Sequence, residues 1–150
     1  MFVVVLCAHV SFKILSLISV VIEQTELVVT EWHYHAPSKP VEQDKNISHA
    51  ISLDVMKKRA GIKKGIACRF RCRFTLESET ILEYTGEDSY VIDLADKIDK
   101  NELLRMIRNS YSKFKEKFDL RKFGTVLQQH SLKPLDEHKV DLDTILPLLE

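Results

Sequence analysis

Apolar and charged residues alternate most strictly over residues 67–74, which read ACRFRCRF. Successive side chains of a strand point to opposite faces, so Cys68, Phe70, Cys72 and Phe74 share one face and the three arginines share the other. A helix would mix these two sets. The pattern therefore predicts a strand with one buried face and one face in water.

Weaker alternation predicts further strands on both sides of this one. Over 25–35, Leu27, Val29, Glu31, His33 and His35 would share one face, and Glu26, Val28, Thr30, Trp32 and Tyr34 the other. Alternation returns over 47–56, where Ile51, Leu53 and Val55 are predicted to point inward. Residues 81–84 and 89–94 read as short strands. Between them, the basic stretch 57–65, the polar triplet 77–79 and Gly86-Glu87-Asp88 are predicted to be connections.

The hydrophobic period changes after Asp99. Apolar residues recur there every three or four positions, which predicts an amphipathic helix with one buried stripe: Leu103, Ile107, Tyr111, Phe114 and Phe118. Asp99 or Asn101 can cap its start and Gly124 can end it. A short helix is expected over 141–149. Strands first and helices last predict an α+β fold, in which an antiparallel sheet meander of four or slightly more strands precedes a long amphipathic helix and a short C-terminal helix.

The first residues leave several interpretations open. Residues 2–22 are strongly apolar, as in a membrane helix or a signal peptide, but Lys13 lies in the middle of the run and no basic residue precedes it. Buried strands are the alternative, and a mis-assigned start codon is another. We therefore treat residues 1–19 as a separate segment and assign 20–150 to one domain, which suits the chain length of 150 residues.

Composition narrows the functional classes. Lys plus Arg and Asp plus Glu both number 22, so the net charge is zero. Dedicated nucleic-acid binders carry an excess of positive charge, so no nucleic-acid partner is expected. A net charge near zero favours self-association. The cysteines number three, and those at 68 and 72 lie too far apart on one strand to bond, so all are expected to be reduced and the protein cytoplasmic.

Candidate chemistry is sparse. His33 and His35 share a strand face with Glu31, which would suit part of a metal site, but no further ligand is evident. Arg69, Arg71 and Arg73 could contact phosphates or an acidic protein; cross-strand pairing with residues such as Asp54 or Glu83 is the alternative. The sequence contains no phosphate-binding glycine loop, nucleophile elbow or paired-carboxylate motif. No enzymatic activity and no cofactor are therefore expected.

The order of segments is similar to the SecB family of protein-export chaperones, which includes SecB-like chaperones of toxin–antitoxin pairs. The matching pieces are a strand end that reads HAPSKP at 35–40, strand segments at 50–55, 66–74 and 90–94, the long helix, and the segment LKPL at 132–135. The proline-aromatic signature that the family carries at the head of the long helix is replaced here by residues 104–108, LRMIR.

This resemblance implies an ATP-independent holdase that binds unfolded polypeptides in apolar grooves, for protein export or antitoxin protection. Family members form homotetramers, built as dimers of dimers, so a dimer or tetramer is expected. The groove candidates are Trp32, Tyr34, Tyr111 and Phe114. Export members bind the SecA motor through acidic residues on the outer sheet, whereas Arg69, Arg71 and Arg73 are the partner-surface candidates here. A metal-binding β-rich enzyme and a basic-sheet adaptor for nucleic acid or an antitoxin remain the alternatives.

Overall fold

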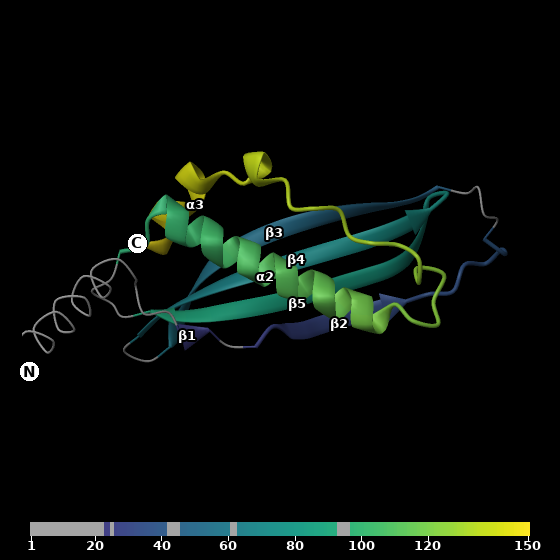
Figure 1. The fold of residues 1–150 in the computed structure, drawn as a ribbon, viewed down its shortest axis with the longest axis horizontal. Coiled ribbons are helices and arrows are strands. Elements are labelled where there is room, and N and C mark those ends of the chain that lie inside the picture. The colour runs from purple at the N-terminus through teal and green to yellow at the C-terminus, as the bar shows by residue number, and fades with distance from the viewer. Residues whose placement is uncertain (1–22, 25, 42–45, 61–62, 93–96) are drawn as a thin grey trace, which may run out of the picture.

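A computed structural model describes residues 23–24, 26–41, 46–60, 63–92 and 97–150. It has two layers, a twisted antiparallel sheet and a helical layer on one of its faces (Figure 1). The predicted α+β class, with a long helix and a short C-terminal helix after the strands, is confirmed. The interpretations of residues 1–19 fall outside the described residues.

The sheet is built from β1 (Glu23–Gln24), β2 (Val28–Tyr34), β3 (Ile47–Ala60), β4 (Lys63–Leu76) and β5 (Glu79–Ile92). Strands β3, β4 and β5 form a meander of long hairpins. β1 and β2 both pair with the far side of β5, so the chain crosses the sheet between β2 and β3, as in a Greek key. One sheet edge is therefore formed by β1 and β2, and β3 forms the other.

Two predicted connections are wrong. The basic stretch 57–65 belongs mostly to β3 and β4, which stay paired from Ile47–Leu76 to Ala60–Lys63. Gly86, Glu87 and Asp88 do not break a strand either, because β5 runs without interruption through all three. The predicted turn at 77–79 is confirmed in place, since Glu77 and Ser78 adopt positive φ angles of 47° and 74° in a two-residue hairpin.

The face assignment predicted for β2 changes at a bulge. Pairing with β5 shifts register between Val29 and Glu31, which leaves Thr30 as the extra residue. Val29 therefore pairs with Gly86 and lies on the same face as Trp32 and Tyr34, whereas the sequence pattern grouped it with Glu31 and His33. Val28 is left 59% exposed.

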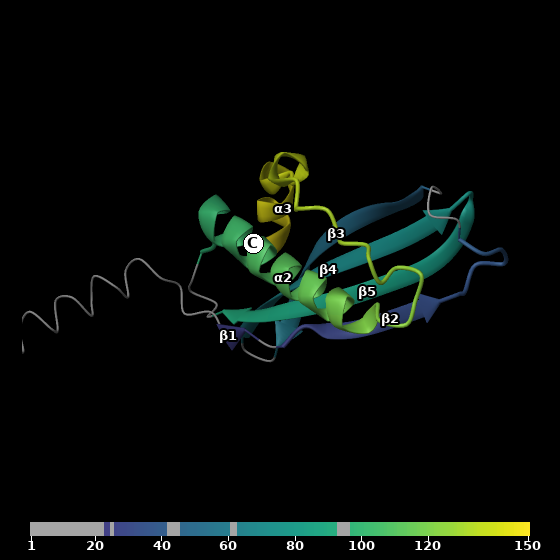
Figure 2. The same cartoon turned by 45° about the vertical axis from the view of Figure 1, so that its right-hand side comes forward.

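Helix α2 (Lys100–Arg121) lies diagonally across the sheet, as Figures 1 and 2 show. The Asp99 carboxylate accepts a hydrogen bond from the Glu102 amide (2.8 Å), which confirms the predicted cap. All five residues of the predicted apolar stripe are buried. After the helix the chain turns at Gly124, which has a φ of 76°, and returns on the β3 side through η1 (Glu137–Lys139) and α3 (Leu142–Leu149).

The core between the two layers is an aromatic stack. Phe114 stacks on Tyr84 with ring centroids 4.2 Å apart, and Phe118 stacks on Phe74 at 5.3 Å. The Tyr84 hydroxyl donates a hydrogen bond to the Phe114 carbonyl (2.9 Å), so this buried polar group is satisfied. The predicted buried face of β4 is confirmed, since its two cysteines and two phenylalanines are at most 2% exposed.

Candidate binding groove

A cavity of about 600 Å³ opens where β3, α2 and the returning chain meet. Helix α2 packs on β4 and β5 through the aromatic stack, and the chain after it packs beside β3. The space left between them has an apolar lining formed by Ile51, Leu53, Phe70, Tyr111, Leu135, Val140 and Ile145. Lys133, Asp136, Lys139 and Asp141 form its polar rim. We call this cavity the β3 groove.

The β3 groove reaches the edge of the sheet and not only its face. Residues 49–53, five consecutive positions of β3, line it. A groove on one face of a strand would be lined by alternate residues, because successive side chains point to opposite faces. Since β3 is the last strand on its side of the described sheet, part of its backbone N–H and C=O groups point away from β4, along the edge that this groove reaches.

The returning chain over residues 130–137 forms the outer wall of the β3 groove. Two hydrogen bonds hold this wall at Lys133. The Lys133 amide donates to Nε2 of His49 (3.2 Å), and the Lys133 carbonyl accepts from the Tyr111 hydroxyl. The His49 ring also packs on Phe74, with ring centroids 4.9 Å apart. Partial burial, followed by the charges of Lys133 and His130, holds the pKa of His49 below its usual value. The wall is thus tied both to β3 and to α2.

The groove candidates from the sequence fall in different places. Tyr111 lines the β3 groove, and burial raises the pKa of its hydroxyl to about 12. Phe114 is fully buried beneath α2, next to the groove residue Phe70. Trp32 and Tyr34 are half-buried on β2, at the opposite edge of the sheet. The structure therefore brings only Tyr111 of these four to the β3 groove.

Most residues that line the groove were not singled out as site residues. Ile51 and Leu53 were predicted to point inward, and that alternation was the available signal. Leu135, Val140 and Ile145 come from the returning chain, whose position over β3 depends on tertiary packing. Their sequence pattern carries no sign of the strand that they face.

The arginine row lies on the outer face of the sheet, away from α2, and each member has a cross-strand carboxylate partner. Arg69 contacts Glu87 (2.8 Å), Arg71 contacts Asp54 (3.3 Å) and Arg73 contacts Glu83 (2.8 Å). Glu87 is nearly buried and is also paired with Lys58. Arg71 and Arg73 are more than half exposed, so their pairs contribute at most about 1 kcal/mol each.

Of the two histidines predicted as part of a metal site, His33 lies on β2 and His35 directly after it. Glu31 accepts a hydrogen bond from the Thr85 hydroxyl (3.1 Å), and His33 lies opposite Glu83 across the sheet. Among the described residues, no three His, Cys, Asp or Glu side chains lie close enough to hold a metal ion. Within the same residues, no helix has the length and apolarity needed to span a membrane.

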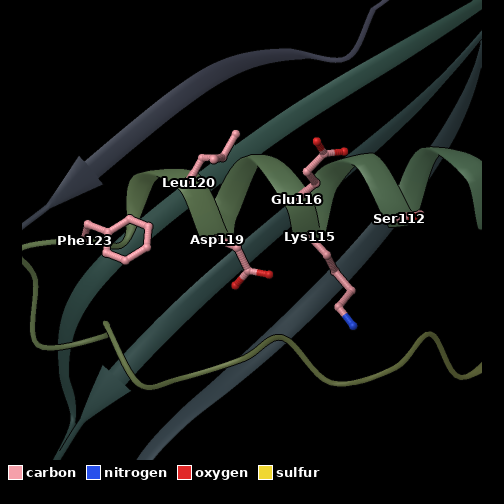
Figure 3. A pocket seen from close by; sticks show the side chains of 6 residues that line it. All are labelled: Ser112, Lys115, Glu116, Asp119, Leu120 and Phe123. Atoms are coloured by element: carbon pink, nitrogen blue, oxygen red, sulfur yellow. The ribbon is translucent and has the colours of Figure 1, made fainter.

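A second hollow lies on the outer face of α2, near its C-terminal end (Figure 3). The side chains around it come from one helix and the turn after it, and Leu120 and Phe123 are exposed by 62% and 66%. In Figure 3 Lys115 and Asp119 point to one side of the helix and Leu120 to the other. In the part of the chain that the structure describes, no second helix or strand lines this hollow, so it offers a bound chain less surface than the β3 groove does.

The fold and site define an α+β protein with an open-sided groove at a sheet edge. No protein-family model matches the chain, and no curated protein matches it. Among solved structures, a SecB-like chaperone from Mycobacterium tuberculosis, in complex with a ChAD peptide from the HigA1 antitoxin, is 12% identical, with a TM-score of 0.49. The match covers 76% of this chain and 83% of that one.

A protein of unknown function from Streptococcus agalactiae is 11% identical with a TM-score of 0.39, over 69% of this chain and 89% of its own. Likeness at this level assigns neither a family nor a function to the chain.

Proposed function

We propose that this protein is a non-enzymatic binding protein that holds an extended segment of an unfolded polypeptide in the β3 groove. The observation that carries the proposal is the pairing of an apolar lining with an accessible strand edge. An extended segment can add its backbone to such an edge while alternate side chains enter the apolar space.

The energetics suit a holdase. Burial of apolar surface yields about 25 cal/mol per Å², so a client gains affinity only if its apolar residues are exposed. Backbone pairing along β3 requires no particular client sequence. A folded client hides both its apolar side chains and its backbone groups, and is therefore rejected without a recognition code. Binding and release of this kind need no nucleotide.

The resemblance of the sequence to SecB-like chaperones agrees with this assignment. Within it, unfolded export clients and an antitoxin are the candidate partners, and assembly into a dimer or tetramer is part of the proposal. Engagement of the SecA motor is a weaker component, because the outer sheet face presents arginines whose charges are already paired with carboxylates.

The test uses a fluorescein-labelled, reduced and carboxymethylated protein chain as a permanently unfolded probe, with binding followed by anisotropy. Leu53→Ser in the groove should weaken binding by about tenfold or more, since a leucine side chain contributes about 1.5–3 kcal/mol when fully buried. Leu120→Ser makes the same change in the exposed hollow of α2 and should leave the affinity unchanged.

A short peptide tests the edge separately. A labelled peptide that alternates valine with lysine should bind, and the same peptide N-methylated at alternate residues should not, because it can no longer pair with β3. Equal binding of both peptides would refute edge pairing. Equal loss of binding in Leu53→Ser and Leu120→Ser would place the site elsewhere, and no binding of either probe would end the proposal.

A further inference from the structure

His49 lies at one end of the β3 groove, where the wall crosses the strand. Of the five consecutive β3 residues that line the groove, His49 is the first, and its ring binds the wall at Lys133. This hydrogen bond therefore fastens the wall to β3 at this end of the groove. Beyond it, β3 continues through Ile47 and Ser48, which do not line the groove.

The hydrogen bond requires a neutral imidazole. A backbone amide can only donate, so Nε2 of His49 must offer a lone pair to the Lys133 N–H. When Nε2 takes up a proton it becomes a donor, and donor then faces donor. The protonated ring would also stand beside the ammonium of Lys133, whose charge already disfavours the charged form of His49.

The other contacts of the wall do not depend on this proton. Leu132 is buried, the Tyr111 hydroxyl binds the Lys133 carbonyl, and Glu137 is paired with Arg108 of α2. These contacts keep the wall attached to α2 while its link to β3 is lost. Loss of the His49 bond would therefore leave the wall attached to α2, and the chain after it attached to β3 through α3 and through the Lys57 ammonium, which donates to the Glu150 carbonyl (2.9 Å).

We propose that His49 is a proton-sensitive latch of the β3 groove: the neutral ring holds the wall at Lys133 against β3, and proton uptake releases it and opens this end of the groove to an extended chain. The last step rests on the proposed function. The latch itself is a property of the protein alone.

The charged and titratable groups around His49 support release of the wall when the ring takes up a proton. The wall contributes Lys133 and His130, both of which disfavour the charged ring. Tyr111, Asp136 and Lys139 line the same groove, and Asp136 lies 3.4 Å from the Lys139 ammonium. On the sheet side the ring meets the apolar face of Phe74.

The direction of the pH dependence follows from these contacts. Because the latched state lowers the pKa of His49, the released state takes up the proton first as pH falls. The latch is therefore closed above the usual histidine pKa of about 6.5 and weakens progressively below it.

The test follows the wall and the groove separately, on the full chain. The first measurement is the Lys133 amide, by its proton chemical shift and its exchange rate corrected for intrinsic pH dependence, between about pH 8 and about pH 5.5, a range that brackets the histidine pKa. The second is the affinity for the fluorescein-labelled, carboxymethylated chain over the same range.

We expect the Lys133 amide to lose its hydrogen-bonded shift and protection as His49 titrates. Probe affinity should rise about threefold to tenfold toward low pH, the range for one hydrogen bond of ordinary strength. His49→Gln retains an acceptor for the Lys133 amide but cannot titrate in this range, so both profiles should become flat. His33→Gln, on the exposed outer face of β2, is the matched control and should behave like the original protein.

Each negative result would exclude a different part of the proposal. A Lys133 amide that ignores the titration of His49, or a His49→Gln variant that keeps the pH response, would overturn the latch. If the Lys133 amide follows the titration of His49 but probe binding does not change with pH, the latch does not control the groove. If the Lys133 amide follows the titration of His49 but the probe binds at no pH, the latch is supported and the proposed function is refuted.

Discussion

Gly86 lies in the middle of β5, directly beneath helix α2, and the structure predicts that Gly86→Ala pushes the two layers apart. A Cβ atom added there would lie 2.8 Å from Cδ2 of Phe114 and 3.1 Å from Cδ2 of Leu27. Carbon atoms in good contact are about 3.5–4.0 Å apart, so the Phe114 ring would have to move by roughly an ångström.

The ring has little room to move. Phe114 is fully buried, stacks on Tyr84 at 4.2 Å between centroids and packs on Phe70 at 5.3 Å. Overpacking of this kind costs about 1–3 kcal/mol. The gain from a less flexible unfolded chain offsets about 0.4–1 kcal/mol of this, so a net loss of about 1–2 kcal/mol in the free energy of unfolding is expected.

Urea unfolding, followed by far-ultraviolet circular dichroism and by the fluorescence of Trp32, measures this loss. Phe114→Leu should relieve the clash, so the double variant should be clearly more stable than the sum of the two single losses predicts. Gly124→Ala is the control: its φ of 76° costs about 1–2 kcal/mol, but nothing lies within 4 Å of the added Cβ, and no coupling to Phe114→Leu is expected. Gly86→Ala at unchanged stability, or strict additivity with Phe114→Leu, would refute the close approach.

Two further predictions concern the thiols and the helix cap. Burial raises the pKa of both Cys68 and Cys72 to about 12, so neither forms a thiolate near pH 8. Both should resist a thiol reagent in the folded protein and react at once in urea. Fast labelling of Cys68 or Cys72 in the folded protein, located by peptide mapping so that Cys7 is scored separately, would contradict their burial. Asp99→Ala should cost about 1 kcal/mol of stability by removing the acceptor for the Glu102 amide, and Asp99→Asn should retain most of it; equal losses in both would rule out the cap.

Local hydrophobic patterns predicted the elements in which each face keeps one environment, protein core or water, along its whole length. β4 keeps its alternation because α2 covers one face and water the other, and the stripe of α2 stays in register with the aromatic residues beneath it. The ends of β3 and β4 show no such pattern. Lys57, Lys58 and Lys63 are exposed there, so pairing between strands, and not burial, forms the structure.

Gly86, Glu87 and Asp88 were predicted to form a break because glycine and aspartate are common in turns and no apolar residue interrupts the triplet. Each has a distant partner that overrides this preference. Gly86 makes room for Phe114, Glu87 pairs with Arg69, and Asp88 accepts a hydrogen bond from the Ser110 hydroxyl (2.9 Å). These partners are between 18 and 28 positions away in the chain, so no local window contains them.

The groove lies apart from the region that stabilises the fold. Stability resides in the aromatic stack beneath α2, where Phe114 and Tyr84 have no exposed surface. The wall over β3 is held instead by the buried Leu132, by partly buried apolar residues, and by hydrogen bonds and an ion pair at His49, Tyr111 and Arg108. Displacement of the wall therefore leaves the stack intact, and local opening can cost far less than unfolding. The proposed binding of unrelated chains requires such a separation, because a groove within the aromatic stack would lower the stability of the fold each time a client is bound.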